Sequence, residues 1–280
     1  MKAYPVTVLC RVMKVSRSGF YRHLKQTEGP TDPADAALRE DAKNVFESSD
    51  QTYGSRRMSR ALRALGHPVG RFQARSLMRE LGLRVVPTKR FKVTTDSKHG
   101  HPVAPNVLGR QFDVDAPDTH WAGDITYLWT ASGWLYLAVV IDLYSRKVVG
   151  WALSHRMTTK LVQDALAMAV GRRRPGPGLL HHSDRGSQYA SADYQRDLKR
   201  YGMVCSMSRK GNCWDNSVVE RFFRSLKTER TNHRRYRNRD GAKQDVINYI
   251  EMFYNSQRLH SYLGYVSPNA YEAQPMRETA

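Results

Sequence analysis

Three acidic residues stand out in this sequence because of the elements in which they are expected to lie. Asp124 lies within a run of strand-forming residues, although strands disfavour aspartate and burying a lone carboxylate is costly. Asp184 follows a short apolar strand pattern, and Glu220 lies in an amphipathic helical stretch. Three carboxylates ~4 Å apart, at an effective dielectric of ~20, repel one another by about 4 kcal/mol per pair. A divalent ion such as Mg²⁺ or Mn²⁺ removes that cost, and two such ions support phosphoryl transfer.

Each acid also has a structural interpretation that the residues alone leave open. Asp184 stands in a Ser-Asp-Arg-Gly sequence, which is typical of a turn. Glu220 stands three residues after Ser217, so the two could form a helix capping box. The structural alternative is weakest for Asp124, because strands disfavour aspartate.

The helical stretch over residues 215–229 contains three acids, and helix geometry separates them. At 100° per residue its apolar side chains form one continuous arc: Val218, Val219, Phe222, Phe223 and Leu226. Glu220 falls at the edge of this arc, whereas Glu229 falls on the other side of the helix. Asp215 precedes the helix and is predicted to cap it, and Trp214 is predicted to pack. Glu220 is therefore the acid that we expect to take part in chemistry.

The elements that must position these acids begin near residue 120. Three β-rich segments separated by short turns predict an antiparallel meander, over residues 121–129, 134–143 and 146–153. Helical and strand patterns then alternate, as helix 161–170, strand 179–182, helix 190–201 and strand 203–208. This order indicates an α/β fold, with a mixed sheet flanked by helices. A last helix is predicted over residues 241–256.

Two small all-α units are predicted before this core. In the second of them, Met58, Leu62 and Leu65 share one helix face, and Phe72 is predicted to line the next helix. Both units are similar to helix-turn-helix units, with a basic helical hairpin as the alternative for the first. The predicted segments are a helix-turn-helix-like segment at 1–27, a second helix-turn-helix-like domain at 36–85, a basic linker at 86–117, a catalytic core at 118–235, and a C-terminal helix and tail at 236–280.

The composition favours a polyanionic partner. The 280 residues carry 45 Lys and Arg against 26 Asp and Glu, a formal net charge of +19. Such a charge attracts nucleic acid, and the N-terminal part of the chain holds the larger share of the excess. We expect DNA contacts from the basic N-terminal units, from the helix of Glu220 and from a histidine near Asp184: Arg17, Arg22, Arg71, Arg75, His182, Arg224 and Lys227.

The three cysteines indicate a reducing, cytoplasmic setting. Their number is odd and no C-x-x-C pair occurs, which argues against a disulfide framework and against a structural zinc site. No N-terminal apolar segment is typical of a signal peptide. The longest apolar run, residues 134–141, is too short to span a bilayer, so no membrane association is expected.

The sequence around the three acids resembles a known family. Asp124, Asp184 and Glu220, with 35 residues between the last two, are similar to the D,D(35)E signature of the retroviral-type integrase and transposase superfamily. The segments WAGDITYLW, HHSDRGSQY and GNCWDNSVVERFFRSLKTE resemble the integrase-core reading frame of IS-three family insertion-sequence transposases. The segment TYGSRRMSRALRALG resembles the helix-turn-helix region that precedes this core. The resemblance covers about residues 5–275.

This resemblance implies a ribonuclease H-like core and a metal-dependent reaction on DNA. It implies Asp124 on the first strand, Asp184 after the fourth and Glu220 on a following helix, all as ligands of two Mg²⁺ ions, with Mn²⁺ as an alternative. The implied reaction cleaves transposon ends to give 3′-hydroxyls, which then attack another phosphodiester. The implied partners are transposon-end and target double-stranded DNA, further copies of the chain on DNA, and the product of an upstream reading frame. The chain resembles the downstream frame alone, so we expect it to need that product for full activity in the bacterial cytoplasm, where it associates with the nucleoid when bound to DNA.

Two other functions are compatible with parts of the sequence. A non-catalytic DNA-binding regulator could be built from the two helix-turn-helix units with an inactive core, although the presence of all three acids argues against it. A tyrosine recombinase would share the short fragment His182-x-x-Arg185, needs no metal and forms a phosphotyrosine bond to DNA. A covalent protein–DNA adduct formed in EDTA would distinguish that second alternative.

Overall fold

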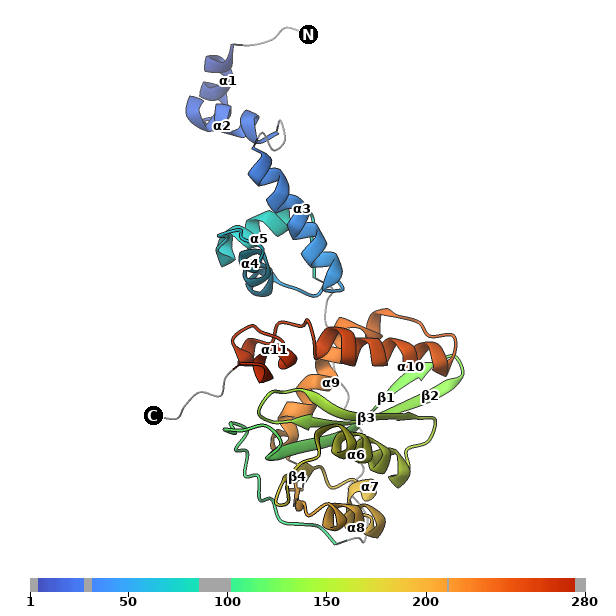
Figure 1. Ribbon diagram of the computed structural model, residues 1–280. Coiled ribbons are helices and arrows are strands. Elements are labelled where there is room, and N and C mark those ends of the chain that lie inside the picture. Colours follow the sequence, from blue (N-terminus) through green and yellow to red (C-terminus); the bar gives the residue numbers. More distant parts are fainter. Residues whose placement is uncertain (1–4, 28–31, 86–101, 211, 275–280) are drawn as a thin grey trace. The chain divides into compact units, whose positions relative to one another are not determined.

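Two units make up the chain, Met1–Val85 and Val86–Ala280. The computed structural model describes residues 5–27, 32–85, 102–210 and 212–274 (Figure 1). Residues 86–101, which form the first part of the predicted basic linker, lie outside the described residues. The segments predicted as core and as C-terminal helix and tail belong to the same unit.

The described part of the N-terminal unit is entirely helical, as predicted. Its helices are α1 (Val6–Val12), α2 (Arg17–Thr27), α3 (Pro33–Ser48), α4 (Ser55–Ala64) and α5 (Arg71–Glu80). Asp32 caps α3 by accepting a hydrogen bond from the backbone N–H of Ala34. Apolar side chains of α3, α4 and α5 form a small core that includes Phe46, Met58 and Leu77. The predicted packing of Phe72 is wrong, because this side chain is 77% exposed.

A five-stranded mixed sheet forms the centre of the C-terminal unit (Figure 1). Its strands are β1 (His120–Thr130), β2 (Gly133–Asp142), β3 (Val148–Ser154), β4 (Leu180–Ser183) and β5 (Val204–Met207), in the spatial order β3-β2-β1-β4-β5. The first three are antiparallel, and β1, β4 and β5 run parallel. The predicted meander and the predicted α/β mixed sheet are therefore confirmed.

Helices cover this sheet because both of its faces are apolar. The C-terminal unit contains α6 (Thr159–Arg173), α7 (Ser187–Ala190), α8 (Ala192–Arg200), α9 (Ser217–Glu229), α10 (Arg239–Asn248) and α11 (Pro268–Glu272) among its described residues. Helix α6 packs on β2 and β3, while α9 and α10 contact β1 (Figure 1). Successive side chains of a strand point to opposite faces of the sheet, and the successive residues Leu137 and Ala138 of β2 are both buried. Gly150 of β3 lets α6 approach closely, since a Cβ atom there would lie 2.2 Å from the carbonyl oxygen of Ala165.

The C-terminal helix differs from its prediction over residues 241–256. Helix α10 begins at Arg239, and Asn238 caps it by accepting a hydrogen bond from the N–H of Gly241. The α-helix ends at Asn248 and continues as a π-helical segment, Tyr249–Tyr254. None of the helices in the described parts of the chain is both long and apolar enough to cross a membrane.

Candidate active site

The register of two parallel strands brings Asp124 and Asp184 together. Strand β1 pairs with β4 from His120 opposite Leu180 to Gly123 opposite Ser183. The next residue along β1 is Asp124, and the next residue after β4 is Asp184. Asp124, partway along β1, which continues to Thr130, therefore lies beside Asp184, which follows the carboxyl end of β4, a place where α/β sheets often carry functional groups.

Helix α9 supplies the third acid. Glu220 lies in its first turn and is exposed. A capping box with Ser217 does not form, because Asn216 is the N-cap residue and no side-chain hydrogen bond caps the helix. The Asn216 side chain instead donates a hydrogen bond from Nδ2 to the carbonyl oxygen of Gly123, at 3.2 Å. This bond joins the start of the Glu220 helix to the residue that precedes Asp124.

The three acids act on one another electrostatically. Burial raises the pKa of Asp124 well above its ordinary value, and the negative charges of Asp184 and Glu220 raise this pKa further. Although the Glu220 side chain is exposed, partial desolvation of its carboxyl group raises its pKa, and the charge of Asp184 raises this pKa further. The positive charge of Lys227 acts on Asp124 in the opposite direction and lowers its pKa. The site thus concentrates negative charge in a way that a bound cation would relieve.

The donor set fits a divalent cation of the Mg²⁺ type. All three candidate ligands offer hard carboxylate oxygens. Asp124 accepts a hydrogen bond from the N–H of Ile125 through Oδ1, and Asp184 accepts one from Gly186 through Oδ1, so both carboxylates are held in place. Within the described residues, no group of three His, Cys, Asp or Glu side chains already has the geometry of a metal centre.

Ionic hydrogen bonds around a buried aspartate fix the loop that leads into α9. Asp215 is completely buried and accepts hydrogen bonds from Arg209, Arg110 and Asn106 at 2.8–3.0 Å. The hydrogen bonds from the Arg209 side chain hold the pKa of Asp215 well below its ordinary value. The prediction that Asp215 caps the helix is therefore wrong. Its buried carboxylate instead joins the end of β5 to the segment around Asn106.

A second set of bonds ties this loop to Asp184. Arg185, the next residue after Asp184, donates from Nε to the carbonyl oxygen of Ser208 at 2.6 Å. The backbone N–H of Ser208 donates to the carbonyl oxygen of Ser183 at 2.9 Å. The three segments that carry the acids are thus connected to one another by hydrogen bonds.

Comparisons with known proteins identify the family of this chain. Two families described as integrase core domains match residues 114–213 and 220–276, and a family described as an HTH-like domain matches residues 33–91. The transposase InsF of insertion sequence IS3A from Escherichia coli K12 is 42% identical over 273 residues, which cover 96% of this chain and 94% of that protein. This chain belongs to the IS3-family transposases.

Two further similarities extend the comparison. An uncharacterized 31 kDa protein of insertion element IS600 from Shigella sonnei is 44% identical to this transposase over 263 residues, covering 94% of the chain and 97% of that protein. A chain in a structure of the simian T-cell lymphotropic virus intasome, in complex with PP2A regulatory subunit B56 gamma, is 17% identical with a TM-score of 0.51. That match covers 85% of this chain and 76% of the viral one, and shows the ribonuclease H-like fold of an integrase core.

The basic residues predicted to contact DNA fall into two groups in the transposase. Arg17, Arg22, Arg71 and Arg75 are exposed on helices of the N-terminal unit, and Arg224 is exposed on α9. Lys227 is partly buried on α9, and its Nζ lies 5.2 Å from the centre of the Tyr127 ring. Burial lowers the pKa of Lys227, while the nearby charge of Asp124 raises it.

The predicted DNA contact of His182 is contradicted by its burial. Its side chain is 0% exposed, and its ring nitrogens lie 2.9 Å and 3.1 Å from the hydroxyl oxygens of Ser206 and Ser208. Burial lowers the pKa of His182 to about 4, so the ring is neutral at physiological pH. Strand β4 lies between β1 and β5 in the sheet, and all four of its residues are buried. The predicted packing of Trp214 is also wrong, since this side chain is 70% exposed in the loop before α9.

Asn216 gives a first testable prediction, as a residue that positions Glu220. Replacing Asn216 with alanine removes the bond to Gly123 and leaves α9 less firmly placed against β1. We expect strand-transfer turnover to fall by roughly 10- to 100-fold, since a displacement of about 1 Å can cost about 10²-fold in rate. DNA affinity should change by less than about twofold.

A matched control is available in the same loop. Asn212 accepts a hydrogen bond from the N–H of Trp214, and within the described parts of the chain its side chain makes no hydrogen bond to β1. The Asn212→Ala variant should therefore retain most of the wild-type turnover. Equal turnover losses in the two variants would show that general loosening of the loop, and not the Gly123 contact, is responsible.

Proposed function

We propose that this chain is a metal-dependent DDE transposase that uses Asp124, Asp184 and Glu220 to cleave transposon ends and join them to target DNA. The observation that supports this most strongly is the register of β1 and β4, which sets Asp124 of β1 beside Asp184 at the end of β4. The electrostatic effect of both Asp184 and Glu220 on Asp124 adds the third acid to the same site. A structural role as turn or cap accounts for neither feature.

In the proposed site, some residues bind the metal ions and the DNA, and another residue keeps helix α9 in place. Asp124, Asp184 and Glu220 would hold two Mg²⁺ or Mn²⁺ ions, which supply activation of the attacking oxygen and neutralisation of the developing charge. Lys227, whose charge already acts on Asp124, would hold a phosphate of the DNA strand beside the acids. Asn216 would keep α9 in place, and its Oδ1 atom, which is buried without a hydrogen-bond partner among the described residues, suits a water or substrate donor at this position.

The proposed partners are two DNA duplexes and further protein chains. The N-terminal unit would bind transposon-end DNA through the exposed Arg17, Arg22, Arg71 and Arg75. Joining two ends requires at least two active sites, so we propose a multimer on DNA in the bacterial cytoplasm. The upstream reading-frame product would act as a further DNA-binding partner.

Strand transfer with purified protein and matched terminal DNA tests this proposal. The expected result is 3′-end cleavage and joining in Mg²⁺ or Mn²⁺, and none in EDTA. The reaction is run with and without the upstream frame product, because the downstream chain alone is expected to be less active. A covalent protein–DNA adduct that forms in EDTA would favour a tyrosine recombinase instead. Binding of terminal DNA without any cleavage in either metal would favour the non-catalytic regulator.

A further inference from the structure

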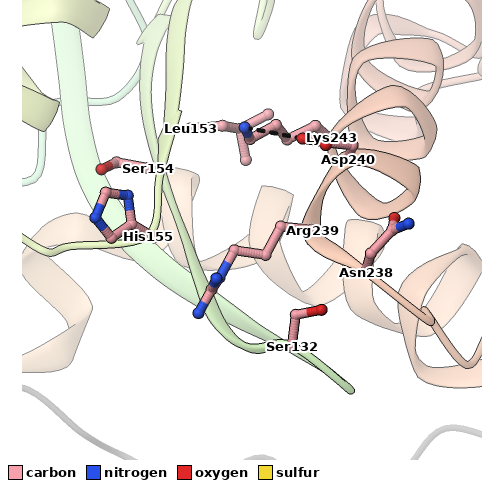
Figure 2. A pocket seen from close by; sticks show the side chains of 8 residues that line it. All are labelled: Ser132, Leu153, Ser154, His155, Asn238, Arg239, Asp240 and Lys243. Atoms are coloured by element: carbon pink, nitrogen blue, oxygen red, sulfur yellow. Dashed lines mark hydrogen bonds and ion pairs between the residues drawn. The ribbon is translucent and has the colours of Figure 1, made fainter.

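A basic pocket lies on the C-terminal unit, away from the three acids. It has a volume of about 390 Å³ and lies among the β1–β2 turn, the end of β3 and the start of α10. Its lining includes Arg239, Lys243 and His155 together with polar side chains such as Ser132, Ser154 and Asn238 (Figure 2). Apart from Leu153 and Asp240, every lining side chain can donate a hydrogen bond.

The guanidinium of Arg239 is held in a fixed position at this pocket. Its Nε donates to the carbonyl oxygen of Trp134 at 3.0 Å, which ties the start of α10 to the β1–β2 hairpin. Figure 2 shows the Arg239 side chain extending between His155 and Ser132. A guanidinium fixed through one nitrogen presents its remaining N–H groups in a defined direction, as recognition of a phosphate requires.

The charges around the pocket are mostly positive. Lys243 Nζ lies 3.2 Å from Asp240 Oδ1. Because the Asp240 side chain is 82% exposed, water competes with Lys243 for its carboxylate and weakens this ion pair. Arg235 and Arg237 are exposed in the segment that leads to Arg239. A row of cations that continues past the pocket suits a polymer of phosphates better than a single small anion.

We propose that this pocket binds a backbone phosphate of the DNA on which the active site acts, which is an inference that rests on the proposed function. Strand β1 ends at Thr130, six residues after Asp124, and the β1–β2 turn follows. At ~3.3 Å per residue this separates the turn from Asp124 by about 20 Å. Duplex DNA rises ~3.4 Å per base pair, so the phosphate in the pocket lies about six base pairs from the one that reacts.

Binding of terminal duplex DNA by the full chain tests the pocket. We compare the wild type with Lys243→Ala and with the double variant Arg239→Ala/Lys243→Ala, by fluorescence anisotropy at several salt concentrations. Each lost phosphate contact reduces the slope of log affinity against log salt by about 0.9, so the double variant should lose up to about 1.8. Its affinity at moderate salt should fall by roughly tenfold. The control is Lys199→Ala, which removes an exposed cation from α8 and should leave the slope unchanged.

Two further measurements separate a charge contact from damage to the hairpin. Arg239→Lys keeps the positive charge but loses the guanidinium that bonds to Trp134, so it should keep the salt slope of the wild type while its affinity falls less than that of the double variant. A neutral methylphosphonate placed about six nucleotides from the reacting phosphate should weaken wild-type binding and have little further effect on the double variant Arg239→Ala/Lys243→Ala. An unchanged salt slope in the double variant, or equal weakening by the methylphosphonate in both proteins, would overturn the inference. The readout is binding, so a wild type without strand transfer counts against the proposed function and not against the pocket.

Discussion

Replacing Asp124 with asparagine is expected to remove strand transfer and, at the same time, to raise the melting temperature of the metal-free protein by a few degrees. The loss of a metal ligand should cost several kcal/mol of transition-state stabilisation, on the order of 10³-fold in rate. The gain in stability follows because burial and the charges of Asp184 and Glu220 disfavour the charged carboxylate. Asparagine retains an oxygen that can accept the hydrogen bond from Ile125.

The control for this prediction is the same substitution at an acid with a structural role. Asp215 is buried among arginine donors, and its charged form is favoured, so Asp215→Asn should lower the melting temperature. Added Mg²⁺ should raise the melting temperature of the wild type and have little effect on Asp124→Asn. A metal-free Asp124→Asn protein that melts below the wild type would contradict our view that this carboxylate is strained by its neighbours.

The second large effect is expected at the other end of the Glu220 helix. Glu229 and Arg258 form a buried ion pair with two hydrogen bonds of 2.6 Å and 2.7 Å, and Tyr249 donates a third bond to Glu229 at 2.7 Å. Replacing Arg258 with methionine leaves a buried carboxylate without its cation. Breaking such a pair from one side costs about 3–5 kcal/mol. For a unit of this size, that corresponds to a fall on the order of 10 °C in melting temperature.

Two other variants show whether burial is responsible for this effect. The double variant Glu229→Gln/Arg258→Met removes both charges and should recover much of the lost stability. Lys160→Met removes the cation of an exposed ion pair with Asp164 one turn away and should leave the melting temperature unchanged. Calorimetry or circular dichroism measures all of these. Equal losses in Arg258→Met and Lys160→Met would contradict the assignment.

The order of the core elements and the places of the acids could be predicted from the sequence because these features are local. Alternating β-formers predicted β1 to β3, and the short apolar run before Asp184 predicted β4. The arc of apolar residues on α9 set Glu220 apart from Glu229, which the structure places in a buried ion pair. The two aspartates come together because β1 pairs with β4. This pairing joins residues about 60 positions apart, and the periodicity of the sequence does not reveal it.

The features missed by sequence reasoning depend on partners distant along the chain. Asp215 was expected to cap α9, but it binds Arg110, more than 100 positions earlier. His182 was expected near DNA because it lies two residues before Asp184, yet the burial of β4 between its neighbours turns it inward. The basic pocket combines residues from three separate elements, so no single stretch of sequence indicated it. In each case the sequence identifies the polar or charged residue, but it does not show whether the fold buries that residue or which distant residue it contacts.

Strand transfer by Asp124→Asn, Asp184→Asn and Glu220→Gln, compared with the wild type in Mg²⁺, is the most direct measurement of the central claim. Each substitution removes one carboxylate charge at nearly constant size, and DNA binding is measured on the same preparations. If these three acids form one metal-dependent site, all three variants bind terminal DNA as the wild type does and none joins it to a target. Full strand transfer by any one of them would remove that residue from the site and contradict the account.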